Sequence, residues 1–244
     1  MADIQVRALV ERVQLAEAVR LQQQIWGFQD VELIPVRLFV VATKIGGQAF
    51  GAYDGARMVG FCLAIPGLKP GGRSYLHSHM LGVLPEYRNA GVGRTLKLEQ
   101  RREALERGIE LMEWTFDPLE LKNAYFNIER LGAIVRRYVY NQYGTTGSPL
   151  HGGLPTDRCV AEWWLASPHV EAVLRGEADR SRPVEARVSV PVDIGKLRAG
   201  EPAKARVVQK RIGEELTESF RGGLAVVGLE RSADAGTYLL GKWQ

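Results

Sequence analysis

Alternating apolar and polar positions mark residues 75–84 as a half-buried strand. His77, His79, Leu81 and Val83 recur with the period of two that places side chains on one face of a strand. The sequence therefore predicts that both histidines point in the same direction as the two aliphatic side chains after them. A glycine-bearing turn and a long run with helical spacing follow directly.

The same patterns divide residues 3–166 into short strands and helices in the order β-α-α-β-β-β-α-β-α-β-β. Strands are expected at residues 3–9, 48–53, 58–65, 75–84, 109–116, 133–140 and 159–165. Helices are expected at residues 11–26, 36–44, 94–107 and 119–131. Asp54-Gly55 is typical of a hairpin turn, whereas the strand–helix–strand stretch 75–116 implies a parallel pair. The sequence thus predicts an α/β (α+β) protein with a mixed sheet flanked by helices.

The remaining residues form a separate pattern. A helix is expected from Pro168, then a charged linker to Pro183, and the later elements are a strand at 184–194, a helix at 202–220 and a hairpin at 224–229 and 237–240. We therefore expect a main domain at residues 1–166 and a small C-terminal α/β extension at residues 167–244. The extension would lengthen the main sheet, cover the acceptor side or make a dimer contact, and the sequence leaves these three open.

The turn after the strand at 75–84 has the composition of an anion-binding loop. It contains Arg88, Gly91 and Gly93 and leads into a helix that begins near Arg94. The first amide groups of a helix lack helical partners and carry partial positive charge, which suits phosphate groups. Glycine lets the backbone approach such a ligand closely. The alternative is a helix start in which the glycines only ease a tight turn.

Two common phosphate-binding motifs do not fit this turn. No Lys-Ser or Lys-Thr follows the second glycine, as a P-loop requires, and the third glycine of a dinucleotide fingerprint is missing. The order Arg88-Asn89-Ala90-Gly91-Val92-Gly93, preceded by Pro85, instead resembles the acyl-CoA-binding motif of the GCN5-related N-acetyltransferase (GNAT) superfamily.

This resemblance covers about residues 3–166 and implies a GNAT fold, with a mostly antiparallel central sheet, that uses acetyl-CoA or another acyl-CoA as cosubstrate. In that family the turn amides hold the coenzyme pyrophosphate, and the strand before the turn pairs with the pantetheine arm. Carried over to this sequence, the coenzyme-binding residues are Leu81, Gly82, Val83, Arg88, Asn89, Ala90, Gly91, Val92, Gly93 and Arg94. Asn123 matches an asparagine that many members use near the pantetheine or acyl end, with local helix capping as the alternative.

His77 and His79 are candidates for the base that acyl transfer to an amine requires, because an ammonium cannot attack a thioester. A histidine with a pKa near 6.5 accepts a proton at neutral pH. The stretch His77-Ser78-His79-Met80-Leu81 also resembles the strand of the arylalkylamine N-acetyltransferases, in which a His-x-His pair is the proton-accepting relay. The alternative is a pair of strand histidines with purely structural partners.

One family residue is missing. Many GNAT enzymes carry a tyrosine general acid four residues before the glycine that ends the helix after the fifth strand. In this chain the glycine is Gly132, and the tyrosine position is occupied by Ile128. The tyrosines that could substitute, with packing as the alternative role of each, are Tyr125, Tyr138, Tyr140 and Tyr143.

Composition excludes several other classes of protein. The chain has 244 residues, 45% of them hydrophobic, with 32 basic and 28 acidic residues scattered along it, so we expect no nucleic-acid surface. Cys62 and Cys159 lie in apolar runs without metal-ligand spacing, so we expect buried thiols and no metal site. We see no signal peptide and no apolar run long enough to span a membrane, so we expect a cytoplasmic protein.

The sequence therefore predicts an acyl-CoA-dependent N-acyltransferase that acts on the amine of a small molecule, with an amino acid as one candidate. Asp117 is a candidate for binding the acceptor ammonium or, equally, for capping the helix after Pro118. A homodimer is a reasonable expectation for this superfamily. The alternative function is a catalytically inactive acyl-CoA-binding sensor or interaction module, which the missing tyrosine favours.

Overall fold

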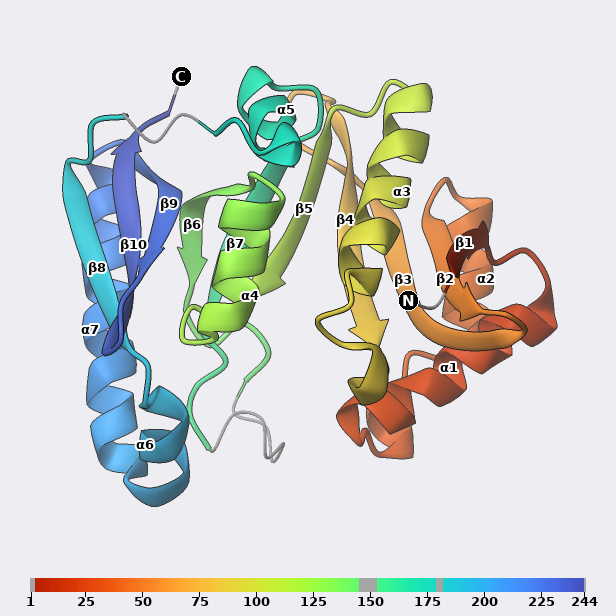
Figure 1. Ribbon diagram of the computed structural model, residues 1–244, viewed down its shortest axis with the longest axis horizontal. Helices are drawn as coiled ribbons and strands as arrows, with labels where there is room; N and C mark the ends of the chain where they lie inside the picture. The colour runs from red at the N-terminus through yellow and green to blue at the C-terminus, as the bar shows by residue number, and fades with distance from the viewer. Residues whose placement is uncertain (1–2, 145–152, 179–181, 244) are drawn as a thin grey trace. The chain divides into compact units, whose positions relative to one another are not determined.

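The computed structural model describes residues 3–144, 153–178 and 182–243 (Figure 1). The chain divides within strand β5 (Leu111–Phe116) into two compact units, residues 1–113 and residues 114–244. We call these the N-terminal unit and the C-terminal unit and describe each by itself.

The N-terminal unit is a sheet with helices packed on it. Its strands follow the order β1-β2-β3-β4-β5, and the full strands are β1 (Ile4–Ala8), β2 (Gln48–Asp54), β3 (Arg57–Leu68) and β4 (Ser74–Val83). Its helices are α1 (Arg12–Trp26), α2 (Val36–Lys44) and α3 (Val92–Glu106), with short 3-10 turns at η1 (Asp30–Glu32) and η2 (Pro85–Tyr87). The β1–β2, β2–β3 and β3–β4 pairs are antiparallel, whereas β4 and β5 run parallel. The predicted mixed, mostly antiparallel architecture is confirmed.

Helical periodicity explains how α1 packs on this sheet. Leu15, Ala18 and Leu21 are buried at a spacing of three residues, so one stripe of the helix faces the core. Phe39 from α2 and Phe61 from β3 are fully buried beside this stripe, with ring centroids 6.0 Å apart. Burial of each such side chain contributes about 1.5–3 kcal/mol.

A β-bulge in β4 changes which side chains share a face. Leu63 pairs with Met80 and Ala64 pairs with Ser78, which leaves His79 as the extra residue. Before the bulge, Ser78 faces α3; after it, Leu81 faces α3 as well, because a Cβ placed on Gly93 would lie 3.7 Å from Leu81 Cδ2. The prediction that Leu81 and Val83 share a face with the histidines is therefore wrong: alternation continues on each side of the bulge but shifts by one residue across it.

The C-terminal unit contains a second set of paired strands. Their order is β7-β6-β9-β10-β8, with β6 (Ile134–Val139), β7 (Arg158–Trp164), β8 (Ala186–Pro191), β9 (Leu224–Arg231) and β10 (Ala235–Lys242). Val135 of β6 pairs with Val226 of β9, so the strands after residue 166 continue the sheet that β6 and β7 begin.

The helices of this unit differ in two places from the sequence prediction. The helix expected at 119–131 is split into α4 (Leu121–Tyr125) and a π-helical turn η3 (Phe126–Arg130). A short helix α6 (Ile194–Gly200) was not expected: the sequence prediction placed only Ile194 in an element, as the last residue of a strand. The remaining helices are α5 (Pro168–Arg175) and α7 (Pro202–Arg221).

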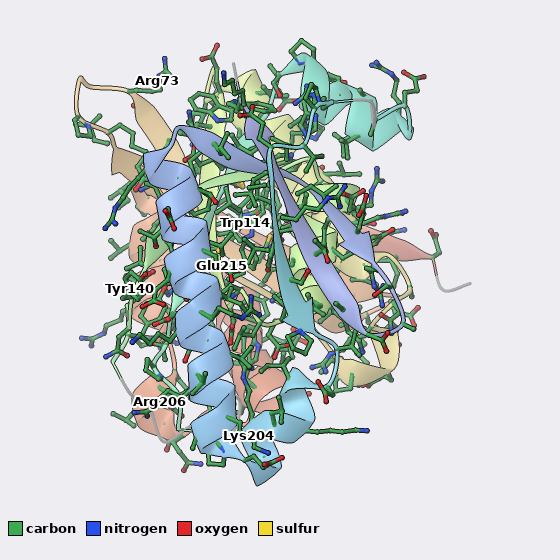
Figure 2. All side chains as sticks on the ribbon, turned by 90° about the vertical axis from the view of Figure 1, so that its left-hand side faces the viewer. Arg73, Trp114, Tyr140, Lys204, Arg206 and Glu215 are labelled. Carbon is green, nitrogen blue, oxygen red and sulfur yellow. The ribbon has the colours of Figure 1, made fainter. Side chains whose placement is uncertain are left out.

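Helix α7 lies against β6, β8 and β9 and presents a charged outer face to solvent. Figure 2 shows α7 along its length, with Lys204 and Arg206 near its start and Glu215 further along. Arg211 Nη1 contacts Glu215 Oε2 at 2.9 Å on this face, one turn apart. Tyr138 of β6 packs on the opposite face, where Gly213 leaves room for its ring: a Cβ on that glycine would lie 2.9 Å from the tyrosine hydroxyl oxygen.

Candidate acyl-CoA turn and histidine pair

Arg88 braces the turn between β4 and α3. Its Nε donates a hydrogen bond to the carbonyl oxygen of Val83 at 3.2 Å, and its Nη2 donates to the carbonyl oxygen of Ile25 at 3.3 Å. One guanidinium thus links the end of β4 to the end of α1. The arginine fixes the turn's shape as well as placing a positive charge beside it.

Gly91 begins α3 in a left-handed conformation, with a φ of 85°. Asn89, two residues earlier, is also left-handed at 63°, a conformation that asparagine tolerates better than most residues. The first helical hydrogen bond of α3 runs from Thr95 N to the carbonyl oxygen of Gly91 at 3.0 Å, so the amides of residues 92–94 precede the helical ladder. Nothing lies within 4 Å of a Cβ placed on Gly91, so a ligand phosphate has open space there.

The other two glycines of the motif have different surroundings. A Cβ on Gly82 would lie 2.8 Å from both Ile25 Cδ1 and Trp26 Cη2, so this glycine allows α1 to pack closely on β4. A Cβ on Gly93 would make only ordinary contacts with Leu81 and Val83. Packing therefore requires glycine at 82, backbone conformation favours it at 91, and neither requires it at 93.

His77 and His79 lie side by side on β4, with ring centroids 6.0 Å apart and ring planes at 43°. Burial and, secondarily, the neighbouring His79 lower the pKa of His77 to about 4, while Glu113 acts in the opposite direction. The bulge residue His79 is the more exposed of the two, and desolvation lowers its pKa as well. Both rings are therefore neutral at neutral pH and able to accept a proton.

A charged pair lies beside His77. The residue opposite His77 on the parallel strand β5 is Glu113, whose carboxylate contacts Lys69 Nζ at 2.6 Å. Lys69 Nζ also lies 4.6 Å from the centre of the Tyr75 ring. Glu113 is nearly fully buried, so the ion pair with Lys69 compensates part of the cost of desolvating its carboxylate.

A buried lysine of α3 packs against the opposite face of β4, and sequence reasoning did not single it out. Lys97 of α3 is 2% exposed, and its Nζ donates to Ser78 Oγ at 2.7 Å. Ser78 in turn donates to Gln100 Oε1 at 3.0 Å. Burial lowers the pKa of Lys97 to about 7. The only signal in the sequence was a lysine at a position that the apolar period of α3 places toward the sheet.

Asp117, Asn123 and Ile128 belong to the C-terminal unit. Asp117 Oδ2 contacts Arg198 Nη2 at 2.6 Å, and its Oδ1 accepts a hydrogen bond from Leu119 N at 2.8 Å. Asn123 is exposed at the third position of α4, and Ile128 is buried in η3. Asp117 therefore already has a cation and an amide as partners.

The four tyrosines considered as substitutes for the general acid differ in their surroundings. Tyr138 donates to Asp157 Oδ2 at 2.7 Å, and burial together with this carboxylate raises its pKa strongly. Tyr140 contacts Thr217 Oγ1 and Tyr143 contacts Thr115 Oγ1, each at 3.1 Å, and both rings are about half exposed. Tyr125 lies under the guanidinium of Arg231, 5.5 Å from the ring centre. A raised pKa makes Tyr138 a poor proton donor.

Within the described ranges no group of His, Cys, Asp or Glu side chains is arranged to hold a metal ion. Among those same residues no helix combines the length and apolar character of a membrane span. Cys62 and Cys159 are both free and buried, as expected.

A bulged strand, a left-handed glycine and a helix N-terminus follow one another between β4 and α3, an arrangement that suits an anionic ligand. Residues 17–132 match the sequence model of the acetyltransferase (GNAT) family, so the chain carries a GNAT acetyltransferase domain. The protein is an acyltransferase that uses an acyl-CoA and an amine acceptor. No curated protein sequence matches the chain.

Solved structures share this fold at low sequence identity. The ribosomal-protein-S18-alanine N-acetyltransferase from Escherichia coli is 18% identical, with a TM-score of 0.53 over 67% of this chain and 95% of that one. The putative acetyltransferase yncA from Salmonella typhimurium, solved with acetyl-CoA, is 15% identical, with a TM-score of 0.53 over 68% and 97%. Aminoglycoside 6'-acetyltransferase type Ii is 19% identical, with a TM-score of 0.52 over 67% and 98%.

Proposed function

We propose that the protein transfers an acetyl group from acetyl-CoA to the primary amine of a small molecule, with His77 and His79 as the proton-accepting groups. The observation that carries this proposal is the histidine pair: two neighbouring imidazoles on the bulged strand, both held neutral by desolvation. A neutral imidazole accepts the proton that an ammonium must lose before it attacks a thioester.

His79 and His77 have different parts in this scheme. The more exposed His79 takes the proton from the acceptor ammonium, and the resulting free amine attacks the thioester carbonyl. The centre of the His77 ring is 6.0 Å from that of His79. His77 accepts the proton from His79, directly or through one water molecule, and passes it on. The C–N bond forms as the C–S bond breaks, and the extra proton on the new amide nitrogen passes to the departing thiolate, so no tyrosine acid is needed at the position of Ile128.

The coenzyme pyrophosphate is placed on the amides of residues 92–94, where α3 begins. Support comes from the left-handed Gly91, the open space above it and the arginine that braces the turn. The strand end Leu81, Gly82 and Val83 offers the backbone groups for the pantetheine arm. Asn123 has an exposed amide that is available to a ligand.

We choose the acceptor class from the distribution of charged residues, because the same fold serves acceptors of different size. The two neighbours whose names state an acceptor act on a ribosomal protein and on aminoglycosides, so the fold is common to large and small acceptors. The 32 basic and 28 acidic residues of this chain are scattered, and no basic block marks a surface for nucleic acid. Asp117 has Arg198 as its cation, so we do not assign the acceptor ammonium to it.

A panel of amines tests the proposal. The purified protein is incubated with acetyl-CoA and single amines (amino acids, arylalkylamines, polyamines), and release of the free coenzyme thiol is measured. Turnover with at least one small amine, lost in the double variant His77→Gln/His79→Gln, is expected. Turnover only with peptides or with a protein N-terminus would contradict the assignment of a small acceptor, and full activity of the double variant would contradict the role of the histidines.

A further inference from the structure

A partly enclosed cavity in the C-terminal unit has no part in the proposed acyl transfer. It has a volume of about 120 Å³. It lies between η3, α5, residues 182–184 just before β8, and strands β9 and β10. Its aliphatic walls are formed by Ile128, Val173, Val184, Val227, Leu229 and Leu239. None of these residues is assigned to the coenzyme or the histidine pair.

Two nitrogen-bearing side chains face this cavity without a polar partner. The Nε2 atom of His169 is buried and makes no hydrogen bond within the described part of the chain. Arg182 has its guanidinium 5.2 Å from the centre of the Trp243 ring, and no carboxylate among the described residues pairs with it. The His169 ring packs edge-on against the same tryptophan, at 5.1 Å between centres. Trp243 thus contacts both groups.

The acidic side chains of the lining already have partners. Glu129 Oε1 accepts a hydrogen bond from Leu229 N at 2.7 Å. Glu230 contacts Arg187 Nη1 at 2.6 Å, on an exposed part of the strand pair. Among the described residues no carboxylate pairs with Arg182, and the buried Nε2 atom of His169 has no hydrogen-bond partner there, which costs free energy unless a ligand or water meets it.

We propose that this cavity binds a short aliphatic carboxylate, with the carboxylate on Arg182 and His169 and the hydrocarbon chain among the aliphatic walls. An empty apolar cavity of somewhat larger volume accommodates a benzene molecule, so a ligand of about five to seven non-hydrogen atoms is the right size here. Arg182 supplies a charge-assisted hydrogen bond. His169 donates a second one from Nε2, in the neutral tautomer that carries its hydrogen on that atom.

Isovalerate is the probe that tests this site. Its binding to the full chain is followed by calorimetry and by the fluorescence of Trp243, with Trp243→Phe identifying the signal. We expect saturable binding of one isovalerate per chain, weakened about tenfold or more in Arg182→Met through loss of the charged donor. The matched control is Arg175→Met, which removes an arginine from α5 that pairs with Glu177 outside the cavity, and it should bind isovalerate like the wild type.

Three results would overturn the assignment. These are no saturable binding of isovalerate to the wild-type chain, equal binding by Arg182→Met, and equal or tighter binding of isopentylamine, which has the same hydrocarbon chain and the opposite charge. His169→Gln provides a second readout with little change of volume, and it should weaken binding less than Arg182→Met. Binding is measured without acyl-CoA, so the result is independent of the proposed acyltransferase chemistry.

Discussion

At the scale of single residues, exposure separates the two histidines of β4. His79 is the bulge residue and keeps contact with solvent, whereas His77 is more enclosed and has a pKa of about 4. Charge is also distributed unevenly around the strand, with Lys69 and Glu113 beside His77 and Lys97 on the opposite face. The lowered pKa of His77 follows mainly from desolvation and secondarily from the neighbouring His79, with further lowering by Lys97 and Lys69.

Replacing His79 with Gln is expected to lower kcat by about a hundredfold near pH 6.5, because most acceptor molecules are then ammonium ions that need a base. The loss should shrink toward pH 9, where more of the acceptor is already neutral. Steady-state kinetics from pH 6 to 9 measure this, with His169→Gln as a control histidine outside the proposed site. Wild-type kinetics of His79→Gln over the whole range would remove His79 from the mechanism.

Lys97 gives a second prediction at this scale, on stability. In the folded chain its pKa is about 7, below the ordinary 10.5. Between pH 7 and 10.5 the unfolded chain therefore binds more protons at this residue than the folded chain does. The stability contributed by this position therefore rises with pH above 7, and the full penalty of burying the ammonium applies below pH 7. Lys97→Met removes that penalty and should be the more stable protein at pH 6.5.

The advantage of Lys97→Met should fall by about 2 kcal/mol between pH 7 and 8.5, as the wild-type lysine loses its proton. Urea unfolding at several pH values measures it, and the exposed Lys44→Met serves as the control. The window stops at pH 8.5 because the buried thiol of Cys62, whose pKa is raised to about 12, adds a dependence of opposite sign to the stability of both proteins at higher pH. A pH-independent difference between the two proteins would show that Lys97 is not charged in the way described.

At the scale of elements, strand β4, its turn and helix α3 form one functional segment. The bulge directs the histidines to one face while Ser78, Leu81 and Val83 face α3, and Arg88 ties the turn to both β4 and α1. Gly82 contributes by allowing α1 to approach, so one motif glycine has a packing role and another, Gly91, a conformational role. The motif thus joins structural and binding requirements in adjacent residues.

Replacing Gly91 with Val is expected to abolish coenzyme binding or raise the KM for acetyl-CoA at least tenfold, because the new side chain occupies the space above the α3 amides. The left-handed backbone should also cost about 1–2 kcal/mol of stability. Calorimetric titration with acetyl-CoA measures the first effect and urea unfolding the second. Gly108→Val is the matched control, since Gly108 is also left-handed, at 72°, and follows the other end of the same helix. Unchanged coenzyme binding by Gly91→Val would contradict the phosphate site.

At the scale of the whole molecule, the last third of the chain is joined to the strands that precede it. Val226 pairs with Val135, Tyr238 donates to the carbonyl oxygen of Pro118 at 2.6 Å, and Arg198 is buried against Asp117. These contacts explain why the C-terminal compact unit begins within β5 and not at residue 167. The family match covers residues 17–132 and ends before the extension begins.

Truncation after residue 166 is expected to give an unfolded or aggregating product. It would expose the edge of β6, leave Asp117 without its arginine and uncover the apolar side of β6 that α7 protects. Circular dichroism and size-exclusion chromatography of residues 1–166 measure this against the full chain. A soluble, cooperatively folding fragment would show that the first 166 residues are an independent domain.

The sequence by itself determined the segment from β4 to α3, the hairpins and most element boundaries, because alternation, glycine turns and helical spacing are local properties. The acyl-CoA motif was readable for the same reason: all of its residues lie within one strand and one turn. Tertiary structure decided the bulge at His79, since register depends on the partner strand β3. It also decided the Lys97–Ser78 contact, the pairing of Asp117 with Arg198 and the cavity around His169. Those features join residues that are distant in sequence, and only the packing of strands and helices brings them into contact.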